Sequence, residues 1–264
     1  MPVTFWAIAE PTAMETLKAK GQWLGVRQLR QQPWGGDVLL SARLPETADS
    51  PLQVHWLWEQ VRPTVKALYA GGGKLAPSSP FLPSAPILPK VQGVFGTAHH
   101  PTTRLCLALL DLLPLQDKRV LDIGTGTGIL ALAATQRGAA LVVATDISPT
   151  AAQVARFNLA QTSRSRWAVL VGDLAQPLRG TFDLVCCNIS AEALLRLLPD
   201  LSRLLPDGNL IASGFTGSEW RTVRRALLAH SIRLLGWQFL NGWLAFLAHS
   251  SAKRETTALP SPPL

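Results

Sequence analysis

The 264-residue sequence is poor in cysteine, has no long apolar run and carries fewer acidic than basic residues. Its three cysteines, Cys106, Cys186 and Cys187, lack the spacing of a metal site, so we expect reduced thiols rather than zinc ligands or disulfides. No apolar run reaches the roughly 18 residues of a membrane span, and the first residues lack the basic start of a signal peptide. These absences predict a cytoplasmic protein with no membrane partner and no bound metal.

The excess of basic residues, 25 against 17 acidic ones, gives a net charge of +8. A basic surface attracts RNA or an acidic partner. The arginines of the second half are scattered over helices and loops, however, and are not interleaved with exposed aromatic residues. The composition therefore leaves an RNA contact open without predicting a dedicated RNA-binding face.

A glycine-rich turn is the most informative motif of the chain. Residues 119–128 read RVLDIGTGTG, an apolar strand that contains Asp122 and runs into three alternate glycines, Gly124, Gly126 and Gly128. Glycine lets the chain bend from strand to helix while its backbone lies close to a ligand. A dinucleotide fingerprint would need its third glycine at position 129, which is an isoleucine. The motif therefore predicts an S-adenosylmethionine site, with Asp122 and the glycines as cofactor-binding residues, rather than an NAD site.

Three later strands also end in polar residues. The runs 139–146, 167–173 and 182–188 end in Asp146, Asp173 and Asn188. Polar groups at the carboxyl ends of strands face the ligand in an open α/β sheet. We expect Asp146 to accept the ribose hydroxyls, Asp173 to lie near the adenine amine and Asn188 to line the methyl channel. A turn or helix entry without a ligand is the alternative for each of them.

Strands alternate with helices along the second part of the chain. Ser148 and Pro149 begin one helix, and the last two strands, at 232–240 and 243–248, are joined by Asn241-Gly242, a strong hairpin signal. This pattern predicts an α/β fold over residues 93–249. We expect a Rossmann-like, mostly parallel sheet of seven strands with helices on both faces and an antiparallel closing hairpin.

Four segments carry a family resemblance: VFGTAHHPTT at 94–103, LDIGTGTGILALAA at 121–134, DISP at 146–149 and CNISA at 187–191. Together they resemble the bacterial ribosomal-protein lysine methyltransferases, PrmA-like enzymes that modify large-subunit ribosomal protein eleven. The resemblance covers residues 91–249 and implies the class I methyltransferase fold with S-adenosyl-L-methionine as cofactor. By position, it implies cofactor contacts at Thr103, Gly124, Asp146 and Asn188.

The loop before the first strand departs from the family pattern FGTGTHPTT at two positions. Ala98 stands in place of a glycine and His99 in place of a threonine. If position 98 needs a positive φ, alanine costs on the order of 1 kcal/mol there. His99 could narrow the cofactor mouth, make the rate pH-sensitive, or point to solvent. We expect His100, which matches the family, to be a packing residue rather than an acid or base.

The first part of the chain is expected to form a small α+β domain over residues 1–70. Strands are predicted at 3–9, 22–29 and 37–42, and helices at 12–20 and 52–69. A linker is predicted at 71–92, because Gly71-Gly72-Gly73 is followed by a proline at every third position from Pro77 to Pro89. Such a linker would let the domain swing a substrate toward the pocket, and a structureless tether is the alternative. Residues 250–264 are predicted to be a disordered tail.

The predicted function is that of a monomeric, S-adenosylmethionine-dependent protein-lysine N-methyltransferase. The resemblance implies lysine or amino-terminal amines of a large-subunit ribosomal protein as substrate, recruited by the amino-terminal domain. Asn188 is the predicted catalytic contact, because it can accept a hydrogen from the incoming amine. The strand end lacks the two prolines and the aromatic residue usual in adenine amino methyltransferases, which argues against a base as substrate. Three alternatives stay open: another amine on a small molecule or RNA, a cofactor-binding pseudo-enzyme, and an NAD oxidoreductase.

Overall fold

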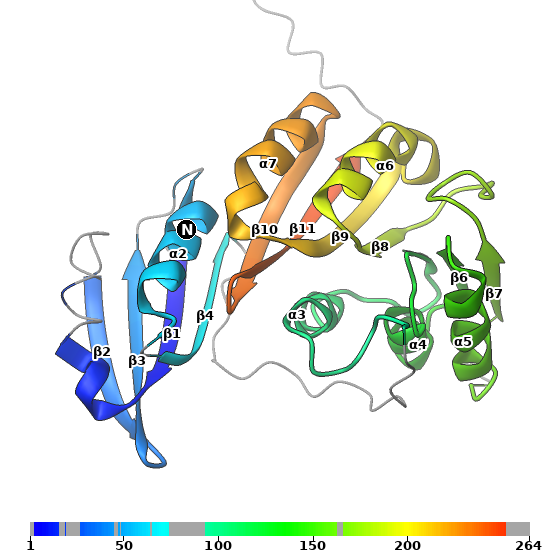
Figure 1. Cartoon of the computed structure of the whole chain (residues 1–264). Helices are drawn as coiled ribbons and strands as arrows, with labels where there is room; N and C mark the ends of the chain where they lie inside the picture. The colour runs from blue at the N-terminus through cyan, green and yellow to red at the C-terminus, as the bar shows by residue number, and fades with distance from the viewer. Residues whose placement is uncertain are drawn as a thin grey trace, which may run out of the picture.

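The structure, a computed structural model, describes residues 3–15, 19, 27–44, 47, 49–63, 65–73, 93–162 and 166–251. Its strands are β1 (Val3–Ala9), β2 (Arg27–Trp34), β3 (Asp37–Leu44), β4 (Val65–Gly73), β5 (Arg119–Ile123), β6 (Leu141–Asp146), β7 (Arg166–Val171), β8 (Leu184–Asn188), β9 (Asp207–Thr216), β10 (Ile232–Leu240) and β11 (Trp243–Ser251). Its helices are α2 (Ser50–Val61), α3 (Pro101–Leu110), α4 (Ile129–Gln136), α5 (Pro149–Leu159), α6 (Ala191–Leu204) and α7 (Trp220–Ala229), with the short 3-10 helices η1 (Pro11–Ala13) and η2 (Gly217–Glu219). The described strands form one sheet in the order β2-β3-β1-β4-β10-β11-β9-β8-β5-β6-β7 (Figure 1).

Strands β5 to β11 form the predicted α/β sheet. Strands β7, β6, β5, β8 and β9 pair in parallel, and β11 and β10 add to them as an antiparallel hairpin. The helix after β5 and the helix after β8 lie on opposite faces of the sheet (Figure 1). In the sheet, β6 and β7 follow β5 on one side, whereas β8 and β9 lie on its other side, so the strand order reverses between β5 and β8. This position is called the switch point, and open α/β sheets bind their ligands there. The predicted Rossmann-like fold is confirmed.

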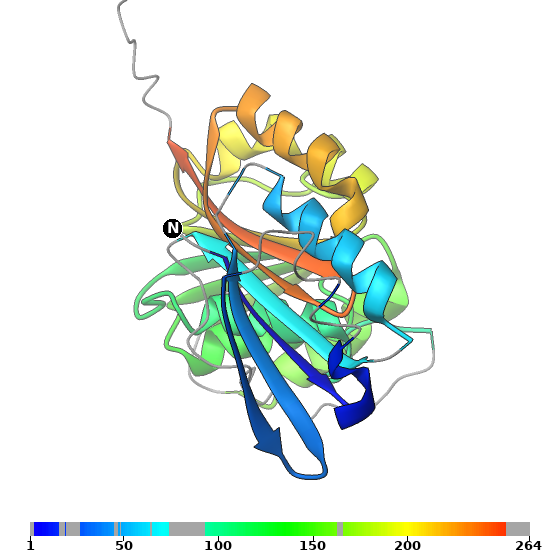
Figure 2. The same cartoon turned by 90° about the vertical axis from the view of Figure 1, so that its left-hand side faces the viewer.

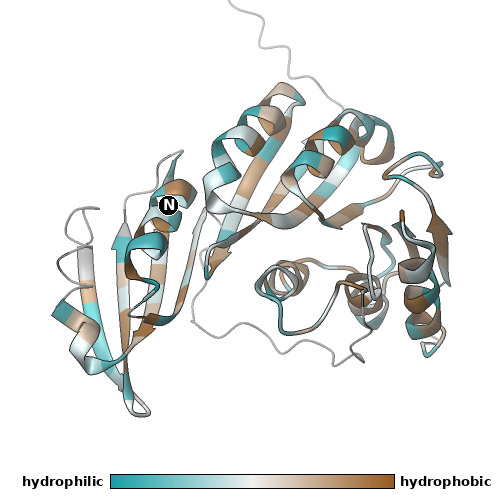
Figure 3. Ribbon diagram, in the orientation of Figure 1, coloured by the Kyte–Doolittle hydropathy of each residue, from teal (hydrophilic) through white to brown (hydrophobic). Residues whose placement is uncertain are grey.

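Helices cover both faces of the sheet. Helices α3, α4 and α5 lie on one face, and α2, α6 and α7 lie on the other (Figure 1). Helix α6 shows the sequence basis of this packing, since Leu194, Leu197, Leu198 and Leu201 recur at spacings of three and four and are all buried. Figure 3 shows the hydrophobic residues concentrated in the strands and in the helix faces turned toward them. Among the described helices, none is long and apolar enough to cross a membrane.

The amino-terminal strands follow the order β1-η1-β2-β3-α2-β4, with β4 and β3 on either side of β1. This arrangement resembles the split β-α-β module of ferredoxin-like folds. The helix predicted at 52–69 is wrong in its second half, because α2 ends at Val61 and residues 65–69 belong to β4. Pro63 explains the break, since it lacks the N–H that would continue the helical hydrogen bonding beyond Arg62. Parts of the helix predicted at 12–20 and of the strand predicted at 22–29 lie outside the described residues.

Strand β4 joins the two parts of the chain into one sheet. It pairs with β1 on one side and with β10 on the other, where Gly71 lies opposite Gln238 and Gly73 opposite Gly236. The linker predicted to begin at Gly71 is therefore wrong at that end, since the three glycines complete a strand. Glycines without side chains let neighbouring backbones approach closely. The proline repeat, at residues 77–89, lies outside the described residues.

Helix α2 packs on the same junction. A Cβ on Gly217 in η2 would lie 2.5 Å from His55 Cβ in α2, and Asp49 pairs with Arg221 of α7 at 3.3 Å. Turned by 90°, the molecule shows α2 beside α7 and β4 beside β10 (Figure 2). The amino-terminal strands are thus held through both the sheet and a helix, rather than by a tether alone. At the other end, β11 continues to Ser251, two residues beyond the predicted boundary, because Ser250 and Ser251 still pair with β9.

The β10–β11 turn contributes a side chain to this junction. Asn241 and Gly242 have positive φ values of 49° and 93°, as expected for an Asn-Gly hairpin. Asn241 Oδ1 accepts a hydrogen bond from Leu68 N at 2.9 Å, and Asn241 N donates one to Leu68 O at 3.0 Å. The hairpin is therefore attached to β4 through both its backbone and its side chain.

We predict that Asn241→Ala lowers the free energy of unfolding by roughly 1–3 kcal/mol, because alanine removes the acceptor for Leu68 N and tolerates a positive φ less well. Asn241→Gly keeps the turn conformation and should lose less. Urea denaturation followed by tryptophan fluorescence measures both variants. Full stability in both would contradict the attachment of the hairpin to β4.

Candidate active site

The glycine turn lies between β5 and α4. Gly124, Gly126 and Gly128 have φ values of 70°, 54° and 83°. A Cβ on Gly124 would lie 2.4 Å from Ile189 Cγ2, and a Cβ on Gly126 would lie 2.2 Å from Phe95 O. The first two glycines are therefore required by the backbone conformation and also by the lack of space. The turn is packed between the loop before α3 and the segment after β8.

Asp122 supports this turn from the protein interior. Its side chain is buried, and its Oδ2 accepts hydrogen bonds from Thr125 Oγ1 at 2.6 Å and from Ala131 N at 3.2 Å. Its Oδ1 is also buried and has no hydrogen-bond partner among the described residues. Burial raises the pKa of the Asp122 carboxyl to about 6. The contacts of Asp122 are thus with the turn and α4, and its predicted contact with the cofactor stays a prediction.

Asp146, at the end of β6, holds the turn from the neighbouring strand. Its Oδ2 accepts a hydrogen bond from Gly126 N and its Oδ1 accepts one from Ser148 N, both at 2.9 Å. Each carboxylate oxygen has a second lone pair. Asp146 therefore fixes the turn and still keeps acceptors for two ribose hydroxyls.

Ile147 is a residue that the strand pattern did not single out. It follows Asp146 directly and its side chain is 69% exposed, although it is apolar. An exposed apolar side chain at the ligand edge of the sheet offers a surface for a flat aromatic group. The signal in the sequence was the isoleucine placed immediately after the acid that ends the strand.

The loop before α3 is attached to the glycine turn by two hydrogen bonds. Thr127 N donates to Phe95 O at 2.8 Å, and Thr127 Oγ1 donates to Gly96 O at 2.7 Å. Ala98 is buried and is not among the residues with positive φ, so the backbone strain considered for this position does not arise. His99 is exposed, which is the third outcome considered for it. Neither departure from the family pattern disturbs the attachment of the loop.

Asn188, at the end of β8, lines a cavity of about 210 Å³. The other lining residues are Phe95, His100, Thr102, Ile189, Ser190, Gly214 and Trp243. Asn188 Nδ2 donates a hydrogen bond to Thr102 Oγ1 at 3.1 Å. Asn188 Oδ1 is buried without a hydrogen-bond partner in the described part of the chain. Asn188 thus belongs to the cavity wall and has an amide oxygen that no described residue uses as an acceptor.

His100 packs at the wall of this cavity and caps α3. Its Nδ1 accepts a hydrogen bond from Thr102 N at 3.3 Å, and its ring meets Phe95 and Trp243 edge to face, at centroid distances of 4.9 and 5.1 Å. Burial lowers the pKa of the His100 imidazole, which favours the neutral ring. These contacts fit the packing role expected for His100.

The structure brings Thr102 to the side chain of Asn188, whereas Thr103 was the threonine predicted to contact the cofactor. Thr103 is fully buried, its Oγ1 has no hydrogen-bond partner among the described residues, and it is not one of the cavity-lining residues. Two successive residues of a helix point to different sides of it, and their sequence positions alone do not tell which one faces the cavity. The contact of Thr103 with the cofactor stays a prediction.

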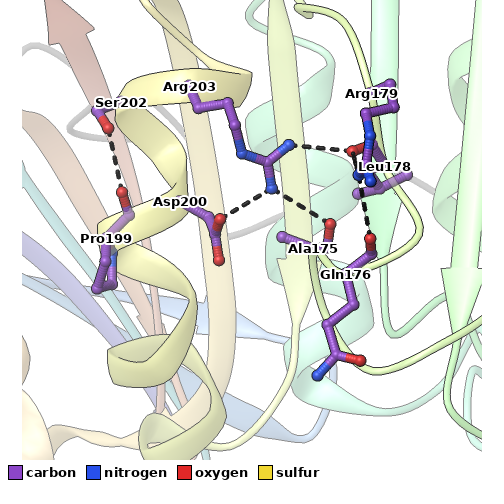
Figure 4. A network of polar contacts seen from close by, with 8 residues as sticks. All are labelled: Ala175, Gln176, Leu178, Arg179, Pro199, Asp200, Ser202 and Arg203. Carbon is purple, nitrogen blue, oxygen red and sulfur yellow. Dashed lines mark hydrogen bonds and ion pairs between the residues drawn. The ribbon is translucent and has the colours of Figure 1, made fainter.

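Asp173 follows β7 and forms an ion pair with Arg196 of α6. The rest of its segment is held by Arg203 of the same helix, which donates hydrogen bonds to Leu178 O at 3.0 Å and Ala175 O at 3.3 Å (Figure 4). The structure therefore gives Asp173 a partner within the protein. Its predicted position near the adenine amine stays a prediction.

The family model of ribosomal protein L11 methyltransferase (PrmA) matches residues 93–251, which is more than half of the chain. The chain belongs to the PrmA family. The match begins at the loop before α3 and ends with β11, so it contains every residue of the candidate site. It confirms the resemblance carried by the loop, the glycine turn and the end of β8.

Individual relatives support the assignment to the PrmA family. Ribosomal protein L11 methyltransferase of Symbiobacterium thermophilum is 40% identical over 155 residues, which cover 58% of this chain and 51% of that protein. Its counterpart in Geobacter metallireducens is 49% identical over 121 residues, covering 46% and 40%. The crystal structure of ribosomal protein L11 methylase from Lactobacillus delbrueckii subsp. bulgaricus superposes with a TM-score of 0.56 at 34% identity, covering 60% of this chain and 81% of that one. The chain spans about half the length of the curated relatives it matches.

The site fits S-adenosylmethionine, the methyl donor that membership in a methyltransferase family implies. The glycine turn leaves its backbone free of side chains, Asp146 keeps acceptors for the ribose, and Ile147 offers an apolar surface. Asn188 and the cavity that it lines are at the end of β8, whereas the glycine turn follows the neighbouring strand β5. The residues after β5 and β6 could therefore hold the nucleoside, and the methyl group would then point toward the cavity at the end of β8.

We predict that Gly126→Ala abolishes cofactor binding, because the new Cβ would meet the backbone of Phe95. Gly180→Ala is the matched control, since Gly180 also has a positive φ of 83° but its Cβ would meet nothing closer than 3.5 Å. We expect the control to lose roughly 1 kcal/mol of stability and to keep its affinity. Isothermal titration calorimetry and urea denaturation compare the two variants, and equal losses would contradict the packing of the loop on the turn.

Asp122 should make stability depend on pH. The pKa of its carboxyl is about 6 in the folded protein and about 3.9 in an unfolded chain, so the folded state binds more protons between these values. The free energy of unfolding should therefore fall as pH rises from about 4 to 6, by roughly 3 kcal/mol in total. Urea denaturation across this range compares wild type with Asp122→Asn, and a difference that does not change with pH would contradict the prediction.

Proposed function

We propose that this chain transfers a methyl group from S-adenosylmethionine to lysine or amino-terminal amines of ribosomal protein L11. The observation that carries the proposal is the buried Oδ1 of Asn188, which has no partner among the described residues and belongs to a residue that lines the cavity beside the glycine turn. An acceptor oxygen suits an incoming amine, which brings N–H donors. Membership in the PrmA family and the names of its relatives support this choice of substrate.

The amine must arrive neutral, whereas a free lysine has a pKa of about 10.4. Phe95, His100 and Trp243 line the cavity and would remove the amine from water, and the sulfonium charge of bound S-adenosylmethionine would oppose a second positive charge, so both effects lower the amine pKa. When bound, S-adenosylmethionine supplies an electrophilic methyl group on a sulfonium. Asn188 Oδ1 accepts one N–H of the amine, which turns the nitrogen lone pair toward that methyl group.

In the transfer, the nitrogen would take the methyl group and the positive charge, the sulfur would keep the electron pair of the broken carbon–sulfur bond and leave as a neutral thioether, and the new ammonium would lose a proton to solvent. No general base is needed beside Asn188 for the transfer itself. Positioning of two reactants in this way contributes roughly 7 to 11 kcal/mol to catalysis. The neutral His100 belongs to the wall of the cavity and not to the proton path.

We further propose that the amino-terminal strands recruit the protein substrate, and that the reaction takes place in the cytoplasm, where ribosomal proteins are made. Residues 1–92 lie outside the region that the family model matches. The same observation favours one alternative, in which the same transfer is directed to another protein amine. Both share the pocket and differ only in what the first strands bind.

The test is transfer of radiolabelled methyl groups from S-adenosylmethionine to purified large-subunit ribosomal proteins. Wild-type protein should label one of them, and Asn188→Ala should lower kcat/KM about 100-fold, because it removes the acceptor for the amine. Asn209→Ala is the matched control. Asn209 lies near the start of β9, whereas the cavity is lined by Gly214 near the end of that strand, and the Asn209 side chain pairs with His249.

Equilibrium dialysis with labelled cofactor accompanies the transfer assay. Cofactor binding without label on any ribosomal protein would overturn the proposed substrate and leave the alternative acceptor. Full activity in Asn188→Ala would overturn the role of its side chain.

A further inference from the structure

Asn188 can face the cavity in two ways. A half-turn of its terminal amide exchanges Oδ1 with Nδ2. With Oδ1 at the cavity, the side chain accepts a hydrogen from an amine. With Nδ2 there, it would present a second donor to that amine and oppose binding. The proposed reaction therefore requires one amide orientation, and some neighbouring group must select it.

Thr102 is the group in contact with the amide. Its Oγ1 accepts a hydrogen bond from Asn188 Nδ2 at 3.1 Å, and its side chain is fully buried. A hydroxyl alone does not select an orientation, since it can donate as well as accept. If the hydroxyl hydrogen pointed to Asn188, the amide would turn Oδ1 toward Thr102 and away from the cavity. The direction of the hydroxyl hydrogen must therefore be fixed from its other side.

His100 fixes that direction. Its Nδ1 lies 2.7 Å from Thr102 Oγ1 and 3.3 Å from Thr102 N. A backbone N–H can only donate, so Nδ1 carries a lone pair and the ring hydrogen is on Nε2. The hydroxyl of Thr102 then donates to Nδ1 and leaves its own lone pair for Asn188. The ring itself cannot turn freely, because it lies between Phe95 and Trp243.

We propose that Thr102 is a positioning residue that, oriented by His100, holds the Asn188 amide with Oδ1 toward the acceptor amine. In this chain of hydrogen bonds, Asn188 donates to Thr102 and Thr102 donates to His100. The chain connects the end of β8 with the first turn of α3. This inference rests on the proposed function, because only a transfer reaction gives the orientation a consequence. It assigns to the loop before α3 a part in catalysis that is separate from its attachment to the glycine turn.

The first test replaces the hydroxyl alone. Thr102→Val keeps the shape of the side chain and should lower kcat about 10- to 100-fold while the Kd of the cofactor changes less than about twofold. Thr102→Ser retains the hydroxyl and should restore most of the rate. Thr135→Val is the matched control, because it also removes a fully buried hydroxyl, one that donates to Leu132 O within α4. An unchanged kcat in Thr102→Val would overturn the proposal.

A double-mutant cycle separates positioning from a structural role. If Thr102 acts through Asn188, Thr102→Val should cause no further loss of rate in the Asn188→Ala background. Losses that multiply would show that Thr102 acts independently and would overturn the proposal. If Thr102→Val fails to fold, His100→Phe replaces it in the cycle, since phenylalanine fills the same space between the two rings and lacks Nδ1.

A spectroscopic measurement keeps this inference separate from the identity of the substrate. Nitrogen-15 NMR of the histidine rings in the full chain reports which nitrogen of His100 carries the hydrogen. We expect an unprotonated Nδ1, and a shift of the Asn188 side-chain amide signals in Thr102→Val. A hydrogen on Nδ1 of the neutral ring would overturn the donor chain. This result holds even if no ribosomal protein is methylated, in which case the proposed substrate fails and the orientation of Asn188 stands.

Discussion

Close approach of backbone to backbone around the glycine turn is the constraint on which the site depends. The turn lies so near Phe95 that a Cβ on Gly126 would come within 2.2 Å of its carbonyl oxygen. On the other wall of the cavity, a Cβ on Gly214 would lie 2.2 Å from Ile189 O. The loop before α3 thus meets the turn after β5 backbone to backbone, β9 meets the segment after β8 in the same way, and the Ile189 side chain fills the space against Gly124. Because of these contacts, residues far apart in the sequence are brought to one cavity.

Features encoded by consecutive residues could be predicted from the sequence. The alternate glycines, the acid that ends β6 and the Asn-Gly hairpin each reflect a local demand of the backbone and appear where expected, whereas Asp173 lies two residues beyond the end of β7. The identity of the hydrogen-bond partners could not be predicted in the same way. Asp173 pairs with Arg196 of α6, and Asn188 contacts Thr102, neither of which was expected. These contacts depend on how helices lie across the sheet, which the spacing of residues within one segment does not determine.

The first part of the chain shows a second limit of local patterns. Three successive glycines usually indicate a flexible connection, yet Gly71–Gly73 lie in a strand between two others. The pattern of a single segment does not reveal that β10 has a free edge for it to pair with. The helix expected at 52–69 was wrong for a different reason, since Pro63 gave a local signal for the end of α2 that the apolar spacing obscured. The family model matches only residues 93–251, so the joining of the two parts is observed from the structure of this chain and not from the comparison.

The continuous sheet also bears on self-association. An unpaired strand edge offers free N–H and C=O groups to any other chain, which makes it a starting point for aggregation. Pairing of β4 with β10 removes two such edges at once and leaves β2 and β7 at the ends of the sheet. Strand β2 carries Arg30 and Pro33, both exposed, and a charge and a proline are residues that discourage edge-to-edge pairing. Separating the two parts would expose the edge of β4 at Tyr69–Gly73, which carries neither a charge nor a proline. Each part therefore keeps the other from pairing its edge with a second molecule.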